Sequence, residues 1–138
     1  MTLDDEQIKD FSVICDALSD DDDRLKRELL SHAGNRWSTG VIYTLGTKGT
    51  LRHAELARAL PGVTQRMLTR TLRQLERDGL ITRHDHQRKT PHPRVNYTLT
   101  GLGKEMLLAM LPLWNWIISN SAAFRASRKA HEQRHGAA

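Results

Sequence analysis

The sequence predicts an α+β fold in which helices predominate and two strands form a hairpin. Apolar residues recur at intervals of three and four along most of the 138 residues, which is the pattern of amphipathic helices. Residues 95–99 alternate instead and place Val95, Tyr97 and Leu99 on one face, as in a strand. The length suits one domain with added arms and excludes a catalytic domain beside a separate regulatory domain.

Three helices are expected in the first third of the chain. The first spans residues 4–18, where an apolar stripe requires a packing partner. The second starts near the aspartate run at 20–23, whose negative charge suits a helix N-terminus, and ends at Gly34. The third begins around Asn35 and stops within residues 46–49.

The middle of the chain predicts a helix-turn-helix. An extended piece at 50–52 leads into a short helix over 53–60, which a Pro-Gly pair breaks. A second helix runs over residues 64–78, with Thr64 as its N-cap and Gly79 in the C-terminal stop position. Two short helices joined by a turn containing glycine have the outline of this motif.

A basic hairpin follows the helix-turn-helix. Residues 80–83 and 95–99 are the expected strands, and the loop between them over 86–93 is polar and basic. A two-stranded wing in this position turns the motif into a winged helix-turn-helix.

The C-terminal part predicts a long helix from Gly101 with a kink at Pro112, followed by a polar, basic and frayed segment. The resulting division is an acidic N-terminal helical arm at 1–24, a winged helix-turn-helix DNA-binding domain at 25–100, a C-terminal dimerisation helix at 101–124 and a basic, flexible tail at 125–138.

Charge is distributed unevenly along the chain. Residues 1–28 hold ten acidic and four basic residues, whereas residues 52–94 hold ten basic and four acidic ones. This asymmetry indicates that one face meets a polyanion such as double-stranded DNA while the acidic arm faces elsewhere. Two solvated surfaces are the alternative interpretation.

The helix over 64–78 has a cationic face and an opposite apolar face. At about 100° per residue, its arginines fall on one face and its leucines on the opposite face. The residues predicted to contact DNA from this helix are Thr64, Gln65, Arg66, Thr69, Arg70 and Arg73. Those predicted from the wing are Arg88, Lys89, His92 and Arg94, which suit phosphates or the minor groove. A solvated helix with an incidentally basic loop is the alternative.

The terminal helices carry more large apolar groups than one winged domain can cover, which predicts a homodimer. The predicted interface residues are Ile8, Phe11, Met106, Met110, Leu113, Trp114 and Ile117. A monomer whose terminal helices fold back on its own core is the alternative, and a pocket for an unknown small-molecule effector among the Met and Trp residues also stays open.

Several residues together resemble the HxlR-type winged-helix transcriptional regulators, relatives of the MarR regulators. The resemblance covers about residues 25–118 and rests on Trp37, Leu56, the run Leu60-Pro61-Gly62-Val63-Thr64, Leu68, Leu72, Leu75-Glu76, Asp78-Gly79-Leu80-Ile81, Arg83, Pro93, Val95, Tyr97-Thr98-Leu99-Thr100, Gly103 and Trp116. It implies a homodimeric regulator of transcription with the helix over 64–78 in the major groove. The sequence departs from the family pattern at Asn96, where a glutamate is usual, and at Arg24, where several members carry a sensing cysteine.

Other signals point to different functions. His131, Glu132 and His135 formally match the HExxH pattern of zinc metalloproteases, but no third ligand accompanies them. Cys15 lies on the first apolar stripe and is interpreted as a buried small hydrophobe, with a redox sensor as the alternative. A winged-helix protein-interaction module without DNA binding is the second candidate function. We expect no enzyme activity, metal, cofactor or membrane segment, and a cytoplasmic location.

Overall fold

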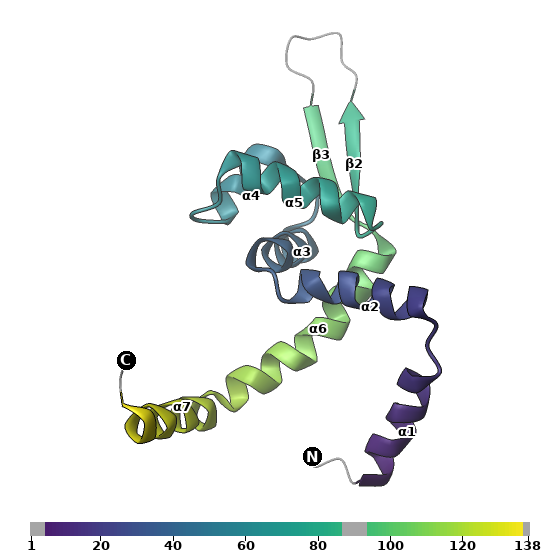
Figure 1. Cartoon of the computed structure of the whole chain (residues 1–138). Coiled ribbons are helices and arrows are strands. Elements are labelled where there is room, and N and C mark those ends of the chain that lie inside the picture. The colour runs from purple at the N-terminus through teal and green to yellow at the C-terminus, as the bar shows by residue number, and fades with distance from the viewer. Residues whose placement is uncertain (1–4, 87–93, 137–138) are drawn as a thin grey trace.

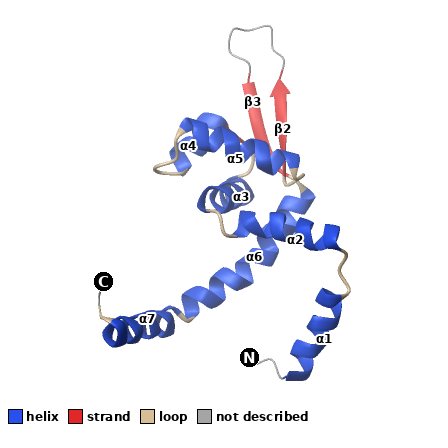
Figure 2. Ribbon diagram, viewed as in Figure 1, coloured by secondary structure: helices blue, strands red, loops and turns tan. Residues whose placement is uncertain are grey.

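The computed structural model describes residues 5–86 and 94–136 and has the predicted α+β architecture (Figures 1 and 2). Its elements in chain order are α1 (Asp5–Asp16), α2 (Asp20–Ala33), α3 (Arg36–Lys48), β1 (Leu51–Arg52), α4 (His53–Ala59), α5 (Gln65–Arg77), β2 (Ile81–His86), β3 (Arg94–Leu99), α6 (Gly101–Ser119) and α7 (Ser121–His135). The winged domain lies at one end, and α1 and the α6–α7 pair extend from it as two arms on the side away from the hairpin tip (Figure 1).

Side-chain caps set the starts of the helices. Ser19 precedes α2 and accepts a hydrogen bond from the Asp22 amide at 3.1 Å. Asn35 Oδ1 accepts from the first amides of α3, and Thr64 Oγ1 accepts from Met67 N at 3.1 Å. Each hydroxyl or amide oxygen satisfies a backbone donor that has no partner within the helix. The predicted boundaries at Asn35 and Thr64 are therefore confirmed.

A three-stranded antiparallel sheet of order β1-β3-β2 forms the wing and its base. β2 and β3 pair from Ile81 opposite Leu99 out to His86 opposite Arg94, and β1 pairs with the inner end of β3. β2 is longer than predicted, because the hairpin pairing continues past Arg83. The piece predicted to be extended at 50–52 is the edge strand β1.

The core lies between α3, α4, α5, the base of the sheet and the first half of α6. Leu68, Leu72 and Leu75 of α5 are at most 2% exposed and belong to the same buried cluster as Val41 and Ile42 of α3. Burying a side chain of this size stabilises the fold by about 1.5–3 kcal/mol. The leucine stripe therefore fixes which face of α5 points outward.

Helix α6 belongs to this core only in part. Its first half contributes Leu107 and Met110, which are 9% and 5% exposed. The helix continues through Pro112 and ends at Ser119, and the chain bends by 58° at Asn120 into α7. Within the described residues, no single helix is long and apolar enough to cross a membrane, although the bent α6–α7 pair meets that test of length and composition.

Two predictions about the ends of the chain are wrong. The segment expected to fray over 125–138 is helical through His135, because most of residues 125–135 are good helix formers, namely arginine, lysine, alanine, glutamate and glutamine. Cys15, expected to be buried, is exposed, since α1 buries none of its residues within the chain. An apolar stripe indicates that a face will be covered but does not identify the surface that covers it.

The junction between the sheet and α6 predicts a specific sensitivity at Gly103. A Cβ at this position would collide with the carbonyl oxygen of Leu80 and lie 2.6 Å from Leu99 Cδ1. That carbonyl is held by a 3.0 Å hydrogen bond from Thr100 N. We expect Gly103→Ala to lower the free energy of unfolding by about 1–3 kcal/mol, measured by chemical denaturation.

Gly101→Ala is the matched control for this substitution. Gly101 lies in the same helical turn, and a Cβ there would meet no atom within 4 Å. We expect Gly101→Ala to leave stability unchanged or slightly raised, because alanine is the better helix former. Equal effects of the two substitutions would contradict the close contact between α6 and the sheet.

Candidate nucleic-acid interface

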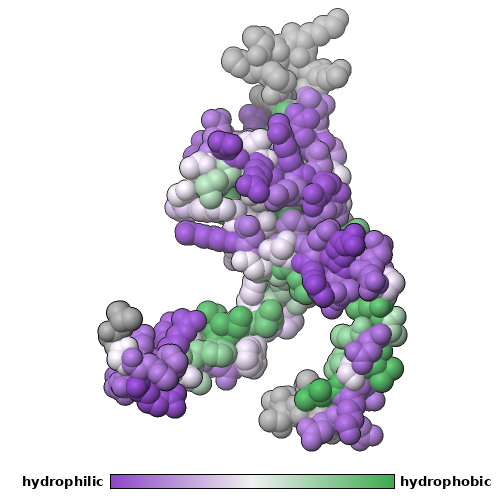
Figure 3. All heavy atoms as spheres, viewed as in Figure 1, coloured by the Kyte–Doolittle hydropathy of each residue, from purple (hydrophilic) through white to green (hydrophobic). Residues whose placement is uncertain are grey.

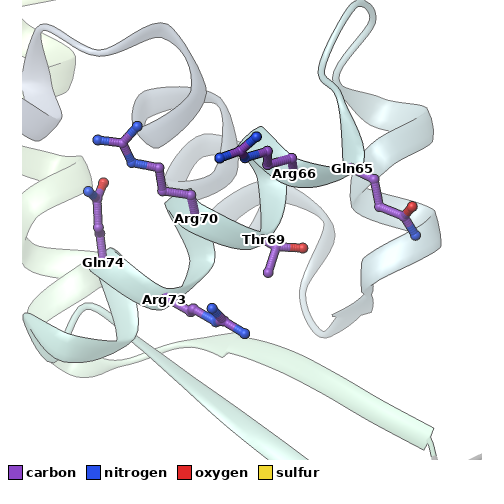
Figure 4. Close-up of a pocket in the computed structure, with 6 residues that line it drawn as sticks. All are labelled: Gln65, Arg66, Thr69, Arg70, Arg73 and Gln74. Atoms are coloured by element: carbon purple, nitrogen blue, oxygen red, sulfur yellow. The ribbon is translucent and has the colours of Figure 1, made fainter.

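The outward face of α5 presents polar and cationic side chains along its whole length. A hollow of about 700 Å³ on this face is lined by Gln65, Arg66, Thr69, Arg70, Arg73 and Gln74 (Figure 4). Five of these six residues were predicted from helical spacing. Gln74 was missed, although its position one turn beyond Arg70 on the same side of the helix is a usable signal.

Three of the arginines on this face have no partner among the described residues. Arg66, Arg70 and Arg73 are exposed and make no hydrogen bond or ion pair with any other described residue. Arg77 differs, because its Nε donates to Asp78 Oδ1 at 3.1 Å. Of the four arginines, Arg77 is therefore paired with the carboxylate of Asp78, and the other three are unpaired among the described residues.

The two predicted threonines already have internal partners. Thr64 Oγ1 caps α5, and Thr69 Oγ1 hydrogen-bonds His53 Nε2 at 3.2 Å. His53 begins α4, so this bond ties the two helices of the motif together. No pattern in the sequence points to His53, since it lies sixteen residues from Thr69 and the two meet only through the tertiary packing.

The hairpin continues the basic surface from α5. Arg73 of α5 and Arg83 of β2 line one small hollow between α5 and the sheet, together with Tyr97. Arg83 also lies 3.8 Å from Asp85 across an exposed ion pair. The predicted wing residues Arg88, Lys89 and His92 lie outside the described residues, and Arg94 is described only as the first residue of β3.

The C-terminal end of α5 is anchored by a buried histidine. His32 of α2 is 5% exposed, and its Nε2 donates to Asp78 Oδ2 at 2.6 Å while Nδ1 shares a hydrogen bond with Ser38 Oγ at 3.3 Å. Burial raises the pKa of Asp78, but the hydrogen bonds from His32 and Arg77 outweigh it and hold that pKa below its ordinary value. The carboxylate therefore stays charged and fastens α5 to α2.

The predicted interface residues divide into two groups. Ile8, Phe11, Leu113 and Ile117 are between 41% and 59% exposed. Met106 and Trp114 are half-buried against the core of their own domain. Met110 is almost fully buried there, so the prediction that Met110 faces a partner is not carried further.

The HExxH pattern gains no support from the geometry. His131 and His135 lie one turn apart on α7 with ring centroids 4.3 Å apart. Among the described residues, no group of three histidine, cysteine or carboxylate side chains is arranged to hold a metal ion.

Comparison with known proteins identifies similar chains. The HxlR-like helix-turn-helix family matches residues 32–123. An uncharacterized HTH-type transcriptional regulator of Methanothermobacter thermautotrophicus is 44% identical over 87 residues, which are 63% of this chain and 64% of that protein. The solved structure of the transcriptional regulator YtfH from Salmonella typhimurium is 35% identical with a TM-score of 0.64 and covers 75% of this chain and 90% of its own. A MarR-family regulator from Enterococcus faecalis V583 is 35% identical with a TM-score of 0.61, covering 81% and 96%.

The His32–Asp78 contact predicts a pH-dependent contribution to stability. A carboxyl group whose pKa is lower in the folded state stabilises the fold above its ordinary pKa near 3.8, and this contribution is lost as the pH falls through the lower folded value. We expect Asp78→Asn to lower the free energy of unfolding at pH 7 by about 1–3 kcal/mol, and the difference from wild type to shrink at acid pH.

Asp85→Asn serves as the control in the same denaturation series. Asp85 faces Arg83 at 3.8 Å with 43% of its side chain exposed, so we expect its replacement to be nearly neutral. A loss at Asp78 that persists undiminished in acid would show that the charge of this carboxylate is not the stabilising feature.

Proposed function

The chain belongs to the HxlR-like helix-turn-helix family of transcriptional regulators, and we propose that it acts as a homodimer that binds double-stranded DNA at a near-palindromic operator. Its relatives are regulators of transcription and not enzymes. A regulator of this kind meets its DNA in the cytoplasm, which is the location we propose for it.

The observation that carries the DNA-binding proposal is the set of free arginines on α5. An exposed cation that is not paired with a neighbouring group keeps its charge available to a ligand. Arg66, Arg70 and Arg73 lie along one helix face and have no partner in the part of the chain that the structure describes. A face used for protein binding typically has apolar and aromatic side chains at its centre, whereas this face is lined by arginine, glutamine and threonine. The arrangement therefore favours DNA over a protein-interaction module.

We propose that α5 is the recognition helix and enters the major groove. Gln65, Arg66 and Arg70 lie towards its N-terminal half, which in helix-turn-helix proteins is the part that reaches base edges. Arginine reads guanine through two parallel hydrogen bonds, whereas Arg73, beside the hairpin, suits a backbone phosphate. The wing cations Arg88, Lys89, His92 and Arg94 would add phosphate or minor-groove contacts.

The homodimer follows from the apolar surface of the arms. Ile8, Phe11, Leu113, Ile117 and Ile118 are each at least 41% exposed, and a soluble chain seldom leaves so many large apolar groups in water. A two-fold axis through these arms would set two recognition helices about one turn of DNA apart, roughly 34–36 Å. The operator would then consist of two inverted half-sites.

The proposal predicts different effects for two arginines on the same helix. We expect Arg70→Ala to weaken binding to the preferred duplex by about 1–3 kcal/mol and to relax the preference at one position of each half-site. Fluorescence anisotropy at fixed salt against preferred and random duplexes measures both effects.

Arg77→Ala is the matched control, because Arg77 is already bound to Asp78 and is expected to contribute little to DNA affinity. If Arg70→Ala lowers the affinity equally for preferred and random DNA, Arg70 contacts only the phosphate backbone. Equal effects of the two substitutions on every duplex would contradict the assignment of α5 as the recognition helix.

A further inference from the structure

The apolar stripe of α6 runs past the core that covers its first half. Leu107, Met110 and Trp114 follow one another at intervals of three and four and pack against the winged domain. The same spacing continues through Ile117 and Ile118, which are 41% and 72% exposed. The second half of α6 therefore carries a packing surface that its own domain does not use.

This surface forms a hollow where α6 bends into α7. The hollow is about 450 Å³ and is lined by Leu113, Trp116, Ile117, Ile118, Ser121 and Phe124, with Arg125 and Arg128 at its α7 side. Trp116 and Phe124 meet edge to face with centroids 5.5 Å apart, which holds the two helices at this angle. The hollow is thus an apolar cleft bordered by guanidinium groups.

Helix α1 carries an apolar stripe, like the hollow, but its charged residues are mainly acidic, whereas those of α7 are mainly basic. Ile8, Phe11 and Ile14 form a stripe at intervals of three, and each is more than half exposed. The helix also carries four acidic residues and one lysine, whereas α7 carries four basic residues and one glutamate. Figure 3 shows hydrophobic residues gathered on both arms, each next to hydrophilic ones.

Helix α1 and most of α7 lie outside the residues that match the family. The family match covers residues 32–123, whereas α1 ends at Asp16 and most of α7 follows residue 123. The acidic helix and most of the basic helix therefore lie on either side of the matched residues.

We propose that α1 of one copy seats in the α6–α7 hollow of a second copy, with its acidic residues against Arg125 and Arg128. The proposal rests on the homodimer proposed above and specifies how the arms exchange. Two-fold symmetry makes the exchange reciprocal, so that each copy donates one α1 and covers one hollow. Within one chain, α1 and α7 lie on separate arms with an open gap between them (Figure 1).

Cys15, the only cysteine of the chain, provides a direct test. It lies on the apolar side of α1, two turns after Ile8. Two chains with different tags are co-expressed, one wild type and one carrying Cys15→Ser with Ser121→Cys, and the complex is treated with a short bis-maleimide. We expect a covalent species that contains both tags, because Ser121 lines the hollow.

The control replaces Ser121→Cys by Ala123→Cys. Ala123 lies on the same helix but about 200° around it, facing away from the hollow. We expect at least a tenfold lower yield of the two-tag species. Equal yields from both positions would overturn the exchange. A mass near twice 15.7 kDa without the two-tag species would also overturn it, while leaving a homodimer.

A single chain with Cys15 and Ser121→Cys distinguishes the remaining outcomes. A link within one chain would show that α1 folds onto its own α6–α7 arm and would overturn the exchange. Sedimentation equilibrium at a mass near 15.7 kDa would overturn the homodimer as well.

A charge-reversal series gives an independent measurement that does not depend on cross-linking. Arg125→Glu and Arg128→Glu each place a negative charge opposite the acidic residues of α1. We expect the double variant to raise the dimer dissociation constant about tenfold or more. Adding Asp10→Lys and Asp16→Lys to the same chain is expected to restore most of the affinity. A pair of reversals that leaves the dissociation constant unchanged would overturn the proposed contact.

Discussion

The burial of the leucine stripe of α5 is the constraint on which the rest of the structure depends. Leu68, Leu72 and Leu75 enter the core beside α3, and their burial rotates the helix so that its arginines face solvent. Hydrophobic packing has no directional preference of its own, but a helix with one apolar face can satisfy it in only one orientation. The charged surface is therefore a consequence of the core.

The two ends of α5 are fixed by polar contacts that the core alone does not provide. Thr64 caps its first turn, His53 bonds Thr69 from α4, and His32 holds Asp78 at its last turn. The last two of these bonds connect α5 to α4 and to α2, and three arginines of its outward face keep no partner among the described residues. A helix that must place side chains against base edges benefits from this rigidity, since loosely held side chains lose entropy when they bind.

Sequence patterns predicted the domain better than its arms, for a physical reason. The caps and periodicity of α5 are local, so its bounds were predicted to within one residue at each end. The burial of Met110, the exposure of Cys15 and the pairing of Thr69 with His53 depend on which surfaces meet in space. Residues 125–135 are helical although they are polar, because arginine, lysine, glutamate and glutamine are good helix formers. The free state of Arg66, Arg70 and Arg73 likewise required the structure.

We propose that the outward face of α5 reads DNA from a symmetric dimer. Selection of bound sequences from a pool of random duplexes at controlled salt tests it most directly. We expect an enriched near-palindrome whose half-sites are centred about one helical turn apart, with an affinity that falls steeply as salt rises. Enrichment of no sequence, or of a single asymmetric site bound with little dependence on salt, would contradict it.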